Sequence, residues 1–443
     1  MNRRDFARSL AAAATASALP AGRLGAAMLR RAARLSPRVN GQRLNGWMTA
    51  IGEFGKNPQG GVTRVAYTDA DVAARAYTMQ LMRDAQLAVS IDAAGNIFGK
   101  RAGRDPSAKP IIVGSHVVSV PEGGNFDGNV GTLGAIEVAR TLGEQNIGTT
   151  HPLWVVCWQN EEGGTWGSHL VTSDPTPVEL STLSQSGKRI ADGVRFVGGD
   201  PDRVATARLR RGDVHGYLEL HIEQGGTLER EKLDIGVVEG IVALAQWDVT
   251  IDGVANHAGT TAMGERHDAL LSAARFTDMV NRVVTAEAGR QVGTVGRIQA
   301  LPGARNVVPG RAICALELRD LEDRKVQRLY DVIVAESRKI GAMNGTTFAF
   351  QHVITHESAR CDERVRALIG ASATSLGFST RSLPSGAGHD AQNMARVCPM
   401  GMIFIPSVGG ISHSPKEYSR PQDVTNGADV LLGAVLAMDA SQF

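Results

Sequence analysis

The sequence predicts an α/β protein: a large domain with a central mixed sheet, and a smaller ferredoxin-like α+β domain inserted into it. Apolar, β-rich runs alternate with helical stretches from residue 42 to about 242, and this alternation returns between 358 and 443. Between these parts, residues 243–357 follow the order β-α-β-β-α-β. A chain of 443 residues is long enough for two such domains.

The large domain is predicted from three apolar runs and a helix. The strands are PIIVGSH (110–116), PLWVVCWQNEE (152–162) and GYLELHIEQ (216–224), and the helix is GTLGAIEVARTLGEQ (131–145). Continuous apolar strands are typical of a sheet whose two faces are both covered by helices.

The inserted domain shows six elements in sequence. They are ALAQWDVTIDGVA (243–255), RHDALLSAARFTDMVNRVV (266–284), GTVGRIQAL (293–301), RAICALELRD (311–320), KVQRLYDVIVAESRKIGAMNG (325–345) and TTFAFQHVITHE (346–357). The second and fifth have apolar residues at helical spacing, and the third and fourth form a predicted hairpin. We expect this domain to act as a lid and as a dimerisation surface.

Residues 1–41 are predicted to be a signal and linker. Arg3 and Arg4 precede an Ala-rich stretch in MNRRDFARSLAAAATASALPAG, which is the pattern of a twin-arginine export signal. Its apolar part is shorter than a membrane span, and no other segment is long and apolar enough to insert stably. This pattern predicts a periplasmic or exported protein; the alternative is a basic amphipathic start on a cytoplasmic protein.

Charge and cysteine usage exclude several classes of function. A formal net charge of +2 gives no electrostatic reason to expect nucleic acid as a partner. The four cysteines, Cys157, Cys314, Cys361 and Cys398, form no CxxC pair. A thiolate zinc site is therefore not indicated, and we expect buried free thiols. Pairing in an oxidising compartment is an open alternative.

Histidines and carboxylates gather where the predicted elements end. They are His116, Asp127, Glu161, Glu162, His221 and His413. In an α/β sheet this edge is where sites are built, and imidazole with carboxylate suits zinc, cobalt, nickel or manganese. Six such residues could serve one metal and a base, but two ions bridged by Asp127 explain the number better. One of the paired glutamates would then act as general base.

Seven motifs give the chain a family resemblance. They are GSHVVSVPEGGNFDG, NEEG, ELHIEQG, NHAGTT, NVVPG, SGAGHDAQ and GGISHSPKE, and they cover residues 42–443. With them the chain resembles the metal-dependent amidohydrolases of the M20 peptidase type. It is most similar to their hydantoinase/carbamoylase branch, which comprises N-carbamoyl-L-amino acid hydrolases, allantoate amidohydrolases and β-ureidopropionases.

The resemblance implies two divalent ions per subunit, zinc or manganese, cobalt or nickel. One ion is implied to bind His116, Asp127 and His221, and the other Asp127, Glu162 and His413. The implied reaction is hydrolysis of a linear C–N bond in an N-carbamoyl-L-amino acid or a related ureido acid. The alternative within the fold is hydrolysis of an acyl-amino acid or dipeptide.

The remaining roles are also implied by the resemblance. Glu161 would be the base, and His257 would steady the oxyanion, reaching across a homodimer interface. Asn306 and Arg319 would grip the carboxylate of a small-molecule substrate. The pocket would be lined further by Gln224, Gly386 and His389. Three other histidines, His267, His352 and His356, have no such context and are interpreted as ordinary surface or core residues.

One position departs from the family pattern. An aspartate that orients the first histidine is expected two residues after it, but Val118 stands there. A ligating histidine usually donates its second N–H to an acceptor, and losing that partner lowers metal affinity or activity about 10–100-fold. Glu122 is the nearest acid in sequence, but its position in space is not fixed by the sequence. A third hypothesis is therefore a metal- or ligand-binding protein with impaired catalysis.

Overall fold

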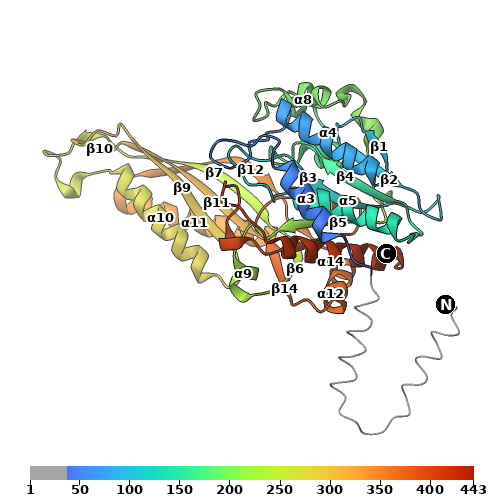
Figure 1. The fold of residues 1–443 in the computed structure, drawn as a ribbon. Coiled ribbons are helices and arrows are strands. Elements are labelled where there is room, and N and C mark those ends of the chain that lie inside the picture. The colour runs from blue at the N-terminus through green and yellow to red at the C-terminus, as the bar shows by residue number, and fades with distance from the viewer. Residues whose placement is uncertain (1–36) are drawn as a thin grey trace, which may run out of the picture.

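The computed structural model describes residues 37–443, in a large domain from which a narrower domain projects (Figure 1). The export signal predicted at the N-terminus lies outside the described residues and stays a prediction. Within residues 37–443, no helix combines the length and the apolar character that a membrane crossing requires.

The large domain is built on one sheet of nine strands. Its order is β1-β2-β4-β3-β5-β15-β6-β13, with β14 also paired to β6. The strands are β1 (Ala88–Ile91), β2 (Ile97–Arg101), β3 (Ile111–His116), β4 (Leu153–Trp158), β5 (Gly216–Ile222), β6 (Ile235–Ile241), β13 (Ala359–Arg360), β14 (Thr380–Ser385) and β15 (Met400–Ile405).

The centre of this sheet is parallel and buried on both faces, as predicted. β4, β3, β5 and β15 run parallel to one another, whereas β1 pairs with β2, β2 with β4, and β6 with β15 and β13 in antiparallel fashion, which makes the sheet mixed. Alternate side chains of β3 enter different apolar clusters: Ile111 and Val113 join one, and Ile112 joins the other. The two clusters are therefore the two covered faces of the sheet.

Helices cover both clusters. One face packs against α3 (Gly41–Ile51), α4 (Asp69–Asp84), α5 (Asn129–Glu144), α12 (Glu363–Ser375) and α14 (Pro421–Asp439). The other face packs against α6 (Trp166–Thr172), α8 (Ile190–Phe196) and α13 (Asp390–Met394). Two further short helices are α7 (Pro177–Ser181) and α9 (Thr227–Glu231). Three short 3₁₀ helices are η1 (Pro201–Ala207), η2 (Met263–Glu265) and η3 (Val408–Gly410).

The projecting domain has the predicted β-α-β-β-α-β order. Its elements are β7 (Ala243–Asp252), α10 (Ala269–Ala286), β9 (Val292–Leu301), β11 (Arg311–Asp320), α11 (Asp323–Asn344) and β12 (Thr347–His356). The strands form an antiparallel sheet of order β12-β7-β11-β9, and both helices pack on one face of it over a third apolar cluster. The chain leaves the large sheet after β6 and returns to it at β13, so the predicted fold class is confirmed.

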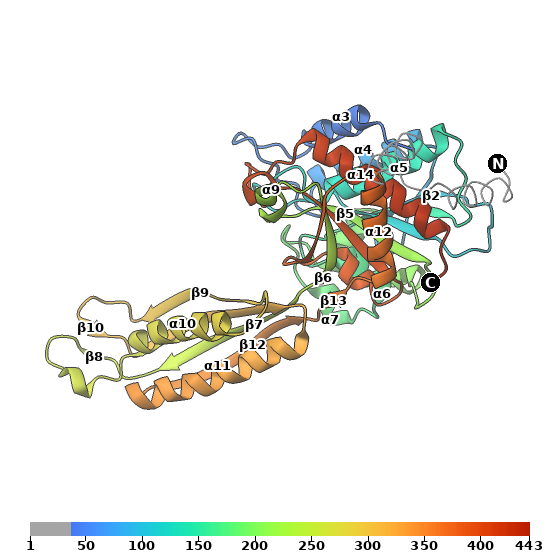
Figure 2. The same ribbon diagram turned by 90° about the horizontal axis from the view of Figure 1, so that it is seen from below.

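A small ribbon at the tip of the inserted domain was not predicted. β8 (Asn256–His257) pairs with β10 (Val307–Val308), which lies in the connection between β9 and β11. Figure 2 shows both strands at the end of the inserted domain that lies away from the large sheet. Two segments about fifty positions apart in sequence thus meet far from the body of the protein.

The four cysteines match their predicted state. All four are buried and unpaired in the part of the chain that the structure describes. Burial raises the pKa of the Cys157 and Cys398 thiols to about 12, so these groups are neutral and unreactive at neutral pH.

An ion pair fixes the first described helix to the helix beside the site. Glu137 on α5 is fully buried, and its carboxylate accepts from Arg43 Nε at 2.7 Å. The same carboxylate accepts from the Asn40 N–H at 2.9 Å and from Thr141 Oγ1 at 3.0 Å. α3 is thereby attached to α5, the helix that begins two residues after Asp127.

We expect Glu137→Ala to lower the free energy of unfolding by about 2–4 kcal/mol, because it leaves the Arg43 charge without its buried partner. Urea unfolding followed by far-UV circular dichroism measures the change. Lys56→Ala is the matched control: it removes an exposed ion pair with Glu53 and should change stability by less than about 0.5 kcal/mol. Equal losses in the two variants would contradict the assigned role of Glu137.

Candidate metal centre

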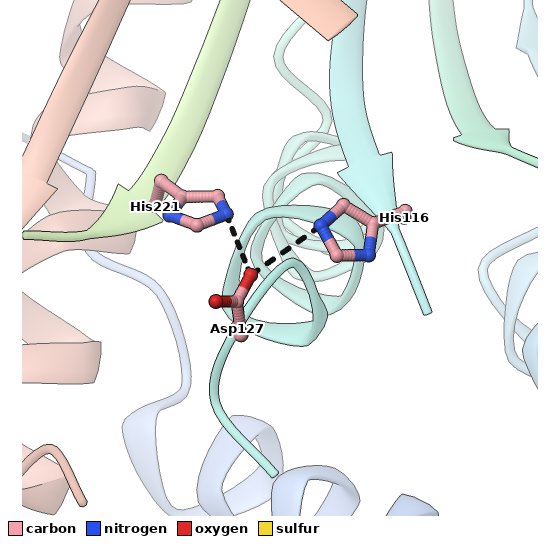
Figure 3. Close-up of side chains that lie close together, drawn as sticks. All are labelled: His116, Asp127 and His221. Atoms are coloured by element: carbon pink, nitrogen blue, oxygen red, sulfur yellow. Dashed lines mark ion pairs between the residues drawn. The ribbon is translucent and has the colours of Figure 1, made fainter. Parts of the chain in front are cut away.

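Three predicted ligands meet at the carboxyl end of the parallel strands (Figure 3). His116 is the last residue of β3, His221 is near the end of β5, and Asp127 lies in the turn before α5. Asp127 Oδ1 is 3.4 Å from His116 Nε2 and 3.1 Å from His221 Nε2. All three side chains are buried.

The turn that carries Asp127 requires a glycine. Gly128 has a φ of 65°, and a Cβ at this position would lie 2.3 Å from the ring of His116. Any other residue would therefore both strain the backbone and displace a ligand. The Gly-rich stretch around Asp127 thus lets the carboxylate approach the histidine closely.

A second group of ligands shares Asp127. His413 follows η3, and its Nε2 lies 3.4 Å from Asp127 Oδ2 and 3.4 Å from Glu162 Oε2. Asp127 therefore presents one oxygen to each group. His413 and Asn160, the residue before the paired glutamates, have left-handed backbones with φ of 53° and 48°. Such strained residues persist where the surrounding structure fixes them, as it does at this edge of the sheet.

Glu161 is close to the first group without belonging to either. Its Oε2 lies 3.4 Å from His116 Nε2, and the side chain is buried. Burial raises the pKa of this carboxyl well above its usual range, although the nearby His116 opposes the shift. Glu161 is thus placed to accept a proton beside the ligands.

The main chain orients both histidines of the first group. His116 Nδ1 lies 3.1 Å from the carbonyl oxygen of Val118, and His221 Nδ1 lies 3.0 Å from that of Ile222. A carbonyl can only accept, so each ring donates from Nδ1, and Nε2 is the nitrogen that faces Asp127. The acceptor expected from an aspartate is therefore supplied by the backbone of Val118. Glu122 is exposed and does not take this place.

The imidazoles and carboxylates of the two ligand groups are suited to binding divalent metal ions. Burial disfavours the charged form of Asp127, but the histidines, His221 foremost, hold the pKa of this carboxyl well below its usual range. Burial raises the pKa of Glu162 to about 7. Glu162 Oε1 is buried and finds no hydrogen-bond partner within residues 37–443. The site therefore brings together closely spaced carboxylates, one carboxylate oxygen without a hydrogen-bond partner, and imidazole rings that face them. A bound cation would stabilise this arrangement.

A cavity of about 300 Å³ opens over these ligands. It is lined by eight of the predicted residues, which are Asp127, Glu161, Glu162, Gln224, Arg319, Gly386, His389 and His413. Arg319 reaches it from the base of the inserted domain, so the cavity lies between the two domains. Its volume suits a small molecule.

Several polar side chains in the cavity walls are held by neighbouring groups. Arg319 Nη1 donates to the Gly386 carbonyl at 2.5 Å, and its Nε donates to Glu317 at 2.7 Å. Gln224 Nε2 donates to Asp127 Oδ2 at 2.7 Å. The His389 ring packs edge-on against His221 with centroids 4.5 Å apart, and burial lowers its pKa well below the usual value.

Two predicted site residues lie elsewhere. His257 is exposed on β8, and Asn306 is exposed next to β10. They are neighbours, since the Ala258 N–H donates to the Asn306 carbonyl at 3.0 Å. Both lie at the tip ribbon, His257 on β8 and Asn306 directly before β10, and neither lines the cavity of its own chain.

Two residues of the site were missed. His356, interpreted from sequence as an ordinary surface or core residue, is exposed and also lines the cavity. Glu417 is buried and accepts from the Asp127 N–H at 3.0 Å and the His413 N–H at 3.2 Å. It thus fixes the backbone of one ligand from each group. Its place in GGISHSPKE was the available signal, but a Glu four residues after a histidine has no distinctive spacing.

Comparisons with known proteins identify the family of this chain. Residues 115–437 match the peptidase family M20/M25/M40. The chain is 37% identical over 402 residues to the N-carbamoyl-L-amino acid amidohydrolase of Geobacillus stearothermophilus, covering 90% of this chain and 98% of that one. It is 32% identical over 387 residues to the allantoate amidohydrolase of Bacillus subtilis, covering 86% and 93%. An amidase of the hydantoinase/carbamoylase family from Burkholderia multivorans superposes with a TM-score of 0.85 at 35% identity, covering 92% of this chain and 100% of that one.

The chain belongs to peptidase family M20/M25/M40, and within it to the hydantoinase/carbamoylase amidases. The predicted family and the predicted class of enzyme, an amidohydrolase, are confirmed. Because the family is metal-dependent, the two ligand groups around Asp127 are its candidate metal centre.

We expect Val118→Ala to leave metal affinity within about threefold of wild type, because the acceptor for His116 is a main-chain carbonyl. The lost methyl groups should still lower the free energy of unfolding by about 1–3 kcal/mol. Calorimetric titration of the metal-free protein with Zn²⁺ measures the affinity. His116→Ala, which removes the ligand itself, is the positive control, and a tenfold loss in Val118→Ala would show that its side chain matters.

Proposed function

We propose that this protein hydrolyses the carbon–nitrogen bond of an N-carbamoyl-L-amino acid or a related ureido acid. The observation that carries the proposal is the carboxylate of Asp127, which presents one oxygen to each of two ligand groups inside a cavity that also contains an arginine. The relatives named for carbamoyl and allantoate substrates support the same chemistry.

The ligand groups fit two divalent ions. His116 and His221 would hold one ion, Glu162 and His413 the other, and Asp127 both. When bound, such ions polarise a carbonyl group and make water more acidic. Zinc or manganese, cobalt or nickel suits a set of three imidazoles and carboxylates.

The protein's own groups would move the proton and position the substrate. Glu161 would take a proton from the attacking water and return it to the leaving nitrogen. Arg319 lies at the cavity wall, where its planar guanidinium suits a substrate carboxylate. Gln224, already donating to Asp127, lines the same cavity.

The competing hypotheses have less support. Hydrolysis of acyl-amino acids or dipeptides is not favoured by the named relatives. The binding-protein hypothesis rested on Val118, and the backbone carbonyl of that residue supplies the missing acceptor. Glu161 also has no purpose in a protein that only binds metal.

A substrate panel tests the proposal. The protein, loaded with Zn²⁺ or Mn²⁺ and assayed for metal content, is offered N-carbamoyl amino acids, allantoate, acyl-amino acids and dipeptides. Release of ammonia from the carbamoyl or ureido compounds is the expected result. Turnover of dipeptides alone would favour the competing hydrolase, and no turnover by protein carrying two metals would overturn the proposal.

We expect Glu161→Gln to lower kcat by about 10²–10⁴-fold while the metal content stays at the wild-type level, because the base is lost and the ligands are kept. Steady-state kinetics and elemental analysis of the same sample provide both measurements. Glu162→Gln is the matched control, since it alters a ligand and should reduce the metal content. If Glu161→Gln also lost metal, Glu161 would be a ligand.

We further propose that the active enzyme is a homodimer in which the tip ribbon completes the partner's cavity. His257 and Asn306 are adjacent, exposed and outside their own cavity, and a two-fold interface repeats any contact in both directions. His257 would donate to the developing oxyanion, a role worth about 10²–10³ in rate. Asn306 would bind the substrate carboxylate together with Arg319.

Mixing two inactive variants tests the shared site. Glu161→Gln and His257→Ala are each expected to be nearly inactive, but a heterodimer of the two keeps one intact site. Random reassembly of an equal mixture should restore about a quarter of wild-type activity. Activity is assayed after mild dissociation and mixing. No recovery, with heterodimers shown by native mass spectrometry, would place His257 in its own chain's site.

A further inference from the structure

A fully buried arginine lies behind the first ligand group. Arg64 has no exposed surface and donates to no carboxylate of residues 37–443, although the charge of Asp71 acts on it from a distance. Its guanidinium is instead surrounded by oxygen atoms of neutral groups. Burial lowers its pKa to about 10, which leaves it charged at neutral pH. A buried charge without a partner is costly, so a specific role is expected for it.

Both the main chain and the side chain of Arg64 hold the segment that follows His116. The Nε atom donates to the carbonyl of Val117. The Arg64 N–H donates to Ser119 Oγ at 2.9 Å, and the Ser119 N–H donates to the Arg64 carbonyl at 2.9 Å. Residues on either side of Val118 are thus bound to one arginine.

These bonds orient one peptide plane. The carbonyl of Val118 and the N–H of Ser119 belong to the same trans peptide and point in opposite directions. The N–H is held by the Arg64 carbonyl, so the Val118 carbonyl points away from Arg64 and accepts from His116 Nδ1 at 3.1 Å. The contact that orients the ligand ring therefore depends on the position of Arg64.

The guanidinium is fixed in turn by two helices. Its Nη1 donates to the carbonyls of Ile51 and Phe54 at 2.8 Å, at the end of α3. Its Nη2 donates to Asn129 Oδ1 at 3.2 Å, at the start of α5 and two residues after Asp127. The planar fork of an arginine can satisfy several acceptors at once, which an ammonium group cannot do in the same geometry.

We propose that Arg64 is a positioning residue for the metal ligand His116, acting through the Val118 peptide. The chain has no aspartate at position 118, so a main-chain carbonyl takes the Nδ1 proton, and Arg64 holds that carbonyl in place. The inference rests on the proposed metal site. It gives the buried arginine a role in metal affinity rather than in folding alone.

The test compares two buried arginines by Co²⁺ titration of the metal-free protein, followed by its visible absorption. Arg64→Lys is expected to bind Co²⁺ about tenfold more weakly than wild type and with altered absorption bands. Arg75→Lys is the matched control: Arg75 is 3% exposed and donates to the Gly95 and Val197 carbonyls, away from His116. It should lose stability but keep wild-type affinity.

A second test replaces the main-chain acceptor of the His116 ring with a side-chain acceptor and measures Co²⁺ affinity again. Val118→Asp supplies a side-chain acceptor for His116, so in that background Arg64→Lys should change Co²⁺ affinity by less than about threefold. A purely structural role for Arg64 would not be relieved in this way. If Arg64→Lys does not fold, Ser119→Ala removes one bond to the same segment and should weaken Co²⁺ binding about threefold.

Two outcomes would overturn the inference: folded Arg64→Lys with wild-type Co²⁺ affinity, or an equal loss of affinity in Arg75→Lys. An undiminished effect of Arg64→Lys in the Val118→Asp background would contradict it as well. Failure of the proposed metal site is distinguishable, because wild-type protein would then show no Co²⁺ binding at all.

Discussion

The carboxylate of Asp127 is the contact on which the rest of the site depends. One oxygen faces His116 and His221 and the other faces His413, so two strand ends, the loop after η3 and a helix start converge on one side chain. Burial disfavours a charge at this depth, and the surrounding imidazoles stabilise it, while Glu417 holds the backbone N–H of Asp127 in place. The position of this carboxylate depends on the Gly-rich turn, on the parallel strands and on the start of α5.

The buried polar groups around the centre lie in two layers. Carboxylates and imidazoles face the cavity, where a cation can bind them. Behind them stand acceptors and donors that no cation reaches, chiefly main-chain carbonyls and the Arg64 guanidinium. This arrangement explains how a chain without an aspartate at position 118 keeps a recognisable ligand set. A histidine ring that donates to a main-chain carbonyl is fixed only as firmly as the chain segment that carries this carbonyl.

The two domains contribute different residues to the candidate site. The large sheet holds the ligands and Glu161, whereas the inserted domain brings Arg319 to the cavity from its base and carries His257 and Asn306 at its tip. Because base and tip lie at opposite ends of the inserted sheet, one chain cannot place both at one cavity in this conformation. In the proposed homodimer a second copy would supply the tip without any change in the large domain, and this is why the dimer and the site are one proposal.

The sequence alone determined the fold class and the candidate ligands. Strand and helix periods are local, and a histidine or carboxylate at a strand end is visible as a residue type; six candidates were found in this way, and the family resemblance then separated Glu161 as the base from His116, Asp127, Glu162, His221 and His413. Tertiary structure decided the rest. The acceptor for His116 is a main-chain carbonyl, which every residue possesses, so no sequence pattern distinguishes Val118 from its neighbours. His356 and Arg64 become meaningful only through segments that meet after folding, because the contacts that define their roles join residues distant in the chain.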